Sequence, residues 1–189
     1  SVFHNGWRLL YENSEEYIGK VLDNTSHIYL SHEHPDHFNP GYLLTEKIKN
    51  KIIEKKIVFI FQKTKDRRVV NFLESKGFKC YEFDQNKNKI SENIEIQIVK
   101  HDFYDSSISI KTPDSKILNL NDCPLRDISE IKKFKKKYGT FDVLLTQFSY
   151  AAWKGGEHGK AIRENAAKEK LNDISNQSKI LDCKKVIPF

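Results

Sequence analysis

One short segment, SHEHPDHF at residues 31–38, constrains this chain more than any other. It places three histidines, one aspartate and one glutamate in eight positions, and these side chains are common ligands of zinc and iron. The segment directly follows HIYL at 27–30, an apolar run rich in residues that favour strands. The pattern predicts a strand that ends in a loop of metal ligands.

Spacing divides the ligands of this loop into two sets. His32 and His34 are two residues apart, and an extended backbone directs such side chains to the same side. Pro35 restricts the backbone and turns the chain, so that Asp36 and His37 can face a second position. A single ion would not take all four ligands from so short a stretch without strain, whereas two adjacent ions can share them.

Two further candidate ligands lie at the ends of expected strands. His101 ends the alternating segment at 94–101, and Asp122 ends the segment at 116–122. Loops at strand ends gather functional groups above a rigid sheet, and an aspartate there can bridge two ions. Asp122 has a second interpretation as a turn residue. Cys123 is expected to be a small buried residue beside the site, with a thiolate ligand as the alternative.

The rest of the chain mixes expected strands with expected helices. This order predicts an α/β fold, with a sheet covered by helices and a β-meander in its middle, as one domain over residues 1–189. The expected strands are at 7–11, 27–30, 56–61, 79–83, 94–101, 107–111, 116–122, 141–148 and 184–189. The expected helices are at 14–22, 39–50, 67–77, 126–139 and around 160–175.

Composition indicates a folded protein outside the membrane. Hydrophobic residues make up 38% of the chain and charged residues 31%, and no apolar run approaches the roughly 20 residues that span a bilayer. No signal peptide opens the sequence, and the three widely spaced cysteines do not suggest a disulfide framework. We therefore expect a cytoplasmic location.

The net charge of +6 is compatible with two kinds of partner, nucleic acid and a small anion. Many of the lysines fall in IKKFKKKYG at 131–139, a pattern typical of the solvated face of a helix. We therefore expect no nucleic-acid partner. Positive charge would instead steer a small anionic substrate toward the protein.

The motif His32-x-His34-x-Asp36-His37 resembles the signature of the metallo-β-lactamase superfamily. This resemblance implies an αββα sandwich with a site for two divalent metal ions. It implies His32, His34 and His101 on one ion, Asp36 and His37 on the other, and Asp122 between them. It also implies a last histidine near the C-terminus. The chain lacks methionine and ends in the apolar run KKVIPF, so we expect it to be truncated at both ends and this histidine to lie beyond residue 189.

Longer segments resemble the catalytic domain of CMP-N-acetylneuraminate hydroxylase and its bacterial relatives. These segments are FHNGWRLLYE, HIYLSHEHPDHF, KILNLNDC and the terminal VIPF. Those hydroxylases also carry a Rieske domain, whose Cys-x-His and Cys-x-x-His ligand pairs do not occur in this sequence. Either that domain lies outside this chain or the protein has none. The ascorbate-6-phosphate lactonase branch, which is hydrolytic, shares the same signature.

Three functions remain open at this point. The first is hydrolysis by a metal-activated water on a sugar phosphate or nucleotide-sugar, with zinc as the expected metal, manganese or iron as alternatives, and Asp36 as the catalytic residue. The second is iron-dependent hydroxylation of a nucleotide-sugar with a Rieske-type redox partner. The third is a metal-binding module without catalysis.

The segment QFSYAAWKGGEHGK at 147–160 is a candidate substrate loop, because it follows an expected strand and is rich in glycine and aromatic residues. Tyr150 and Trp153 could stack on a base or sugar. Lys154 and Lys160 could hold a phosphate, and His158 could contact substrate or metal. The alternative is an ordinary loop whose aromatic residues pack on the core.

Overall fold

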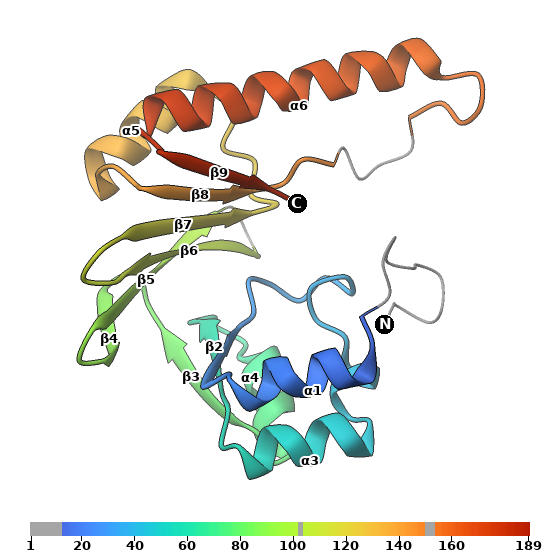
Figure 1. Cartoon of the computed structure of the whole chain (residues 1–189), viewed down its shortest axis with the longest axis vertical. Coiled ribbons are helices and arrows are strands. Elements are labelled where there is room, and N and C mark those ends of the chain that lie inside the picture. Colours follow the sequence, from blue (N-terminus) through green and yellow to red (C-terminus); the bar gives the residue numbers. More distant parts are fainter. Residues whose placement is uncertain (1–12, 102–103, 150–153) are drawn as a thin grey trace. The chain divides into compact units, whose positions relative to one another are not determined.

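A computed structural model describes residues 13–101, 104–149 and 154–189. The chain divides into two compact units, Ser1–Asp84 and Gln85–Phe189, each with its own sheet (Figure 1). A single domain over the whole chain stays a prediction, and the expected strand at 7–11 lies outside the described residues. Among the described helices, none is both long and apolar enough to cross a membrane.

In its described residues, the first unit is a parallel three-stranded sheet with four helices. Its strand order is β1-β2-β3, and β2 is buried at all five positions, as its near-continuous apolar sequence predicts. The strands are β1 (His27–Tyr29), β2 (Val58–Gln62) and β3 (Lys79–Phe83). The helices are α1 (Glu15–Asp23), α2 (Pro40–Leu43), α3 (Glu46–Glu54) and α4 (Arg68–Ser75).

The single helix expected at 39–50 is divided into α2 and α3. The start was predicted correctly, since the Asn39 side chain accepts a hydrogen bond from the backbone N–H of Tyr42 and Pro40 opens the helix. The chain then leaves the helical conformation at Thr45, whose ψ is 136°. The Thr45 hydroxyl donates to the carbonyl of Tyr42, which closes the end of α2 before α3 begins.

The core of the first unit holds the ligand loop in place. Phe59 of β2 is fully buried, and its ring centroid lies 5.3 Å from that of Phe78. Phe38, the last residue of the 31–38 segment, is also buried and packs edge-on against Phe72 of α4 at 5.7 Å. The loop is therefore anchored in the core at its C-terminal end.

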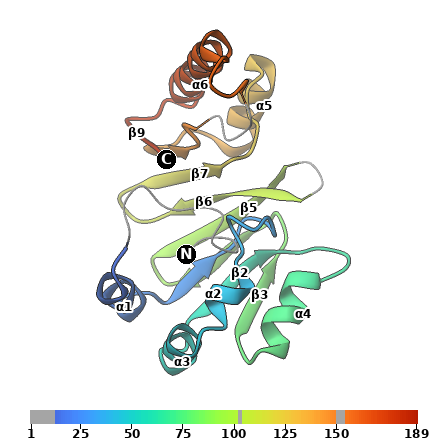
Figure 2. The same cartoon turned by 90° about the vertical axis from the view of Figure 1, so that its right-hand side faces the viewer.

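The second unit is a six-stranded sheet in the order β4-β5-β6-β7-β8-β9. β4 to β7 are antiparallel neighbours, which confirms the meander, while β7, β8 and β9 are parallel (Figure 1). Figure 2 shows β5, β6 and β7 of this sheet side by side. The strands are β4 (Lys87–Ser91), β5 (Ile94–His101), β6 (Asp105–Lys111), β7 (Lys116–Asn121), β8 (Val143–Thr146) and β9 (Lys185–Pro188).

Two helices pack on one side of this sheet, α5 (Ile128–Tyr138) and α6 (Lys160–Ile180) (Figure 1). The Asp127 side chain caps α5, and Ile131 packs into a buried cluster with Leu118 and Leu144 of the sheet. α6 continues five residues past its expected end. Helices and strands in both units confirm the α/β class.

Candidate metal centre

The loop after β1 begins in register with the sheet and ends in a tight turn. The backbone N–H of Leu30 donates to the carbonyl of Ile60 in β2, so the chain stays beside β2 just past Tyr29. The N–H groups of His37 and Phe38 both donate to the carbonyl of His34, at 2.9 and 2.8 Å. Pro35 and Asp36 occupy the middle of that turn, which confirms the predicted bend.

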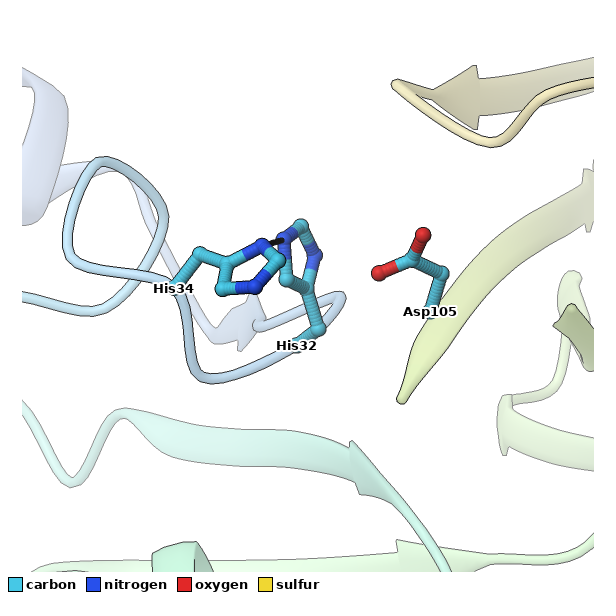
Figure 3. Close-up of side chains that lie close together, drawn as sticks. All are labelled: His32, His34 and Asp105. Carbon is cyan, nitrogen blue, oxygen red and sulfur yellow. Dashed lines mark hydrogen bonds between the residues drawn. The ribbon is translucent and has the colours of Figure 1, made fainter. Parts of the chain in front are cut away.

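Three imidazoles gather in this loop around His32, which is fully buried. Its Nε2 lies 2.8 Å from Nδ1 of His34, and the two rings stand at 86° to each other (Figure 3). Its ring centroid lies 4.3 Å from that of His37, and a ligand nitrogen of each lies within 4.8 Å of the other. Figure 3 also draws Asp105, from the start of β6 in the second unit.

The other nitrogen of His32 contacts a buried hydroxyl. Ser31 Oγ lies 2.9 Å from His32 Nδ1, and both residues are buried. The carbonyl of Ser31 in turn accepts from the side chain of Gln62, the last residue of β2. Such a contact fixes the orientation and tautomer of a metal-binding histidine, so Nε2 is the nitrogen directed at the cluster.

The two acidic residues of the loop are placed differently from the histidines. The Glu33 carboxylate accepts a hydrogen bond of 2.6 Å from the guanidinium of Arg68 in α4, and the two groups form an ion pair. Asp36 has a side chain that is 63% exposed, with Oδ2 3.5 Å from Nε2 of His37. Its expected roles as ligand and catalytic residue stay predictions.

The donors of this loop fit a metal ion. Nitrogens at the 2.0–2.1 Å zinc–nitrogen distance on one tetrahedral ion lie about 3.3 Å apart. Nε2 of His32 and Nδ1 of His34 are 2.8 Å apart, so the rings would separate by only about half an ångström to take an ion in place of their hydrogen bond. Neutral imidazole is also the form that binds metal.

The second unit places three further candidate ligands at one end of its sheet. His101 ends β5 and pairs in register with Asp105 at the start of β6. β7 runs antiparallel to β6, and Asn119 of β7 pairs with Ile108 of β6. The C-terminal end of β7 therefore lies at the same end of the sheet as the start of β6, and Asp122 directly follows it. Sequence reasoning missed Asp105, which opens a strand that was expected to begin only at Ser107.

His101 has a defined environment within its unit. Its Nε2 lies 2.8 Å from the hydroxyl of Ser107, and its ring stacks on Phe134 of α5 with 6.1 Å between centroids. These contacts orient the imidazole in the way that supporting groups orient metal ligands. Cys123, which directly follows Asp122, is buried, as expected for a small residue. Its expected place beside the site stays a prediction.

The expected substrate residues are only partly described. Tyr150 and Trp153 lie outside the described residues, so their stacking roles stay predictions. Lys154 is half-buried, and His158 is exposed in the turn before α6. Neither the phosphate role of Lys154 nor the contact role of His158 is tested by this placement.

Sequence reasoning also missed Lys170, a half-buried cation of α6. Its Nζ donates to the side-chain oxygen of Gln147 at 2.7 Å. Burial, followed by the charge of Arg126, lowers the pKa of Lys170, while the carboxylates of Asp173 and Asp122 act in the opposite sense. Lys170 therefore lies within electrostatic reach of a predicted metal ligand. Nothing in a polar, lysine-rich helix sequence distinguishes it from its neighbours.

Known proteins resemble this chain in structure rather than in sequence. No known family matches the sequence, and no curated protein matches it. The diiron β-hydroxylase CmlA from Streptomyces venezuelae has a TM-score of 0.63 at 15% identity, over 86% of this chain and 35% of CmlA. The short form of human tRNase Z has a TM-score of 0.57 at 14% identity, over 88% of this chain and 72% of that protein.

A third similar structure is YhfI from Bacillus subtilis, a protein of the metallo-β-lactamase fold. Its TM-score is 0.53 at 12% identity, over 94% of this chain and 82% of YhfI. At such low identities these similarities establish the fold alone, and they confirm the metallo-β-lactamase-like fold class. The chain spans about a third of the length of CmlA.

Proposed function

We propose that this protein is a metal-dependent hydrolase that acts on a small anionic metabolite. The main support is the cluster of His32, His34 and His37 on one loop. The buried hydroxyl of Ser31 contacts the ring of His32. Following the superfamily pattern, we assign two divalent ions, zinc in the first place and manganese or iron as alternatives. The proposed ligands are His32, His34, Asp36, His37, His101 and Asp122.

The chain's own residues would each have a part in hydrolysis. A bound metal ion supplies a nucleophile by lowering the pKa of its water to about 7, and it polarises the substrate oxygen. Ser31 would hold His32 in the tautomer whose Nε2 carries the lone pair. Asp36, exposed at the turn beside His37, would accept a proton from the attacking water.

Positive charge supports an anionic substrate, for which we propose a sugar phosphate or a nucleotide-sugar. The chain carries a net charge of +6, and Lys170 offers a half-buried ammonium in the electrostatic surroundings of Asp122. We assign Lys154 and His158 to substrate contacts, and Tyr150 and Trp153 to stacking. We also propose a cytoplasmic location and no nucleic-acid substrate.

One comparison favours a second candidate function, iron-dependent hydroxylation of a nucleotide-sugar. CmlA is described as a diiron β-hydroxylase, and its fold resembles this chain with a TM-score of 0.63. The same histidines and carboxylates suit iron as well as zinc. This chemistry needs electrons from a donor, for which we propose a Rieske-type partner.

Elemental analysis of protein purified without added metal tests both candidates. We expect about two zinc or manganese ions per chain, and then hydrolysis of a phosphoester or lactone in a substrate screen. If the protein instead binds two iron ions and takes up dioxygen only with a reductant, the hydroxylase proposal would be supported and the hydrolase proposal rejected. No metal after reconstitution with zinc, manganese and iron would contradict both. If metal binds but neither activity is found, the protein would be a metal-binding module without catalysis.

A further inference from the structure

A separate cavity of about 220 Å³ lies within the second unit. Four lysines and one glutamate line it, together with polar residues that include Ser109. The lysines are Lys87, Lys111, Lys116 and Lys137, and the glutamate is Glu95. The volume is below the roughly 300–1,000 Å³ of sites for drug-sized ligands, so a smaller ligand suits it.

Strand register explains why these side chains converge. Lys111 of β6 pairs with Glu95 of β5 on one side and with Lys116 of β7 on the other. Ser109 lies two residues before Lys111, so its side chain is on the same face of the sheet. Lys137, near the C-terminal end of α5, also lines the cavity. Four neighbouring strands, β4 to β7, and the end of α5 therefore form the wall.

The cavity concentrates positive charge. Glu95 lies 3.5 Å from Lys87, and within the described parts of the chain no carboxylate forms an ion pair with Lys111 or Lys116. Lys116 is half-buried, donates to the carbonyl of Tyr138 and lies 4.4 Å from the ring centroid of Phe141. Burial and the charges of Lys87 and Lys111 lower its pKa. A bound anion would offset this repulsion.

We propose that this cavity binds a small phosphate-bearing anion at a site separate from the metal centre. Four lysines around one cavity supply charged donors that suit phosphate oxygens, and the buried Ser109 hydroxyl adds a neutral donor. Glu95 and His101 are six residues apart on β5, which corresponds to about 20 Å of strand. The cavity is therefore at the other end of the strands from His101.

Titration calorimetry with pyrophosphate at constant ionic strength tests the site. We expect saturable binding that weakens about 10-fold in Lys116→Gln and in Lys111→Gln, since each loses a charged donor. Lys111 is exposed, so its variant remains informative if Lys116→Gln does not fold. Glu95→Gln should bind several-fold more tightly because it removes a carboxylate from among the described lining residues.

Two controls separate this site from its alternatives. Lys132→Gln removes the same charge from an exposed position of α5 and should leave binding unchanged. Protein stripped of metal by a chelator should bind pyrophosphate with the same affinity, because none of the cavity's lining residues is a proposed metal ligand. Equal losses in Lys132→Gln and Lys116→Gln, or loss of binding when metal is removed, would overturn the proposal. So would a single-stranded RNA that binds well while pyrophosphate does not, since it would indicate a diffuse nucleic-acid surface.

Discussion

Nε2 of His32 and Nδ1 of His34 are 2.8 Å apart, on rings that are almost perpendicular. Two imidazoles in this relationship share a single hydrogen between their facing nitrogens when no ion is bound. A metal ion would replace that hydrogen with little movement of the backbone. The pair is thus the most direct point at which to test the proposed centre.

Replacement of His34 by alanine should remove most of the bound metal and the activity. The variant loses one nitrogen donor and leaves His32 without its facing partner. Elemental analysis of variant and parent, purified side by side, measures the effect. His27→Ala is the matched control, because His27 lies in β1 outside the ligand loop. Full metal content in His34→Ala would show that the ligand assignment is wrong.

Removal of the Ser31 hydroxyl should weaken metal binding without abolishing it. Groups that orient a metal-binding histidine typically contribute about 10- to 100-fold in affinity. Competition with a chelator of known affinity would measure the change in Ser31→Ala. The chain contains a close control, because Ser26 Oγ lies 2.9 Å from Nδ1 of His27, the same distance as in the Ser31–His32 pair. Similar metal affinities in Ser26→Ala and Ser31→Ala would contradict the positioning role.

The turn within residues 31–38 and the closeness of its histidines were predictable because their signal is local. His32 and His34 are two residues apart after an expected strand, and Pro35 favours a turn, so these eight residues determine where the imidazoles lie. Buried β2 was predictable for the same reason, since its apolar run allows no solvated face.

Features that depend on contacts between distant segments were not predictable. β4 is rich in lysine and asparagine, which disfavour strands, and it forms as an edge strand by pairing with β5. Asp105 lies beside His101 only because β6 pairs with β5. Lys170 is distinguished by burial against Gln147, which lies 23 residues away. None of these relationships leaves a periodic pattern in the sequence.

Lys170→Gln should raise the KM for an anionic substrate about 10-fold and change kcat less, because it removes a charged donor from binding rather than from the reacting atoms. The lowered pKa of Lys170 means that its ammonium form is lost earlier than usual as pH rises. The parent should therefore show weakening substrate binding at alkaline pH, and the variant should lack that step. Lys168→Gln, an exposed neighbour on α6, is the control. Identical pH profiles of KM in parent and Lys170→Gln would exclude the role.

Two of the three cysteines, Cys80 and Cys183, should resist alkylation in the folded protein. Burial raises the pKa of Cys80 to about 12 and that of Cys183 to about 11. Both are then protonated at pH 8.5, and only the thiolate reacts. Peptide mapping after iodoacetamide treatment should show rates below those in urea, by about two orders of magnitude for Cys183 and about three for Cys80. Equal rates in buffer and urea would contradict the burial of these thiols.

Phe59→Ala should destabilise the chain by about 3–5 kcal/mol, the usual cost of removing a buried aromatic ring from a core. Phe59 is fully buried in β2 and packs on Phe78, whereas Tyr17 of α1 is 57% exposed. Tyr17→Ala should therefore change the free energy of unfolding by no more than about 0.5 kcal/mol. Urea unfolding followed by circular dichroism measures both variants.

The same measurement tests the predicted single domain. Cooperative folding of residues 1–189 requires that Phe59→Ala lower the stability of the second unit as well, although Phe59 belongs to the first. Hydrogen exchange of the backbone amide of Leu118, which is buried in β7, reports on the second unit. Faster exchange of this amide in Phe59→Ala supports one cooperative domain. Unchanged exchange, with a second unfolding transition in urea, would mean that the two units fold independently and that the prediction of one domain is wrong.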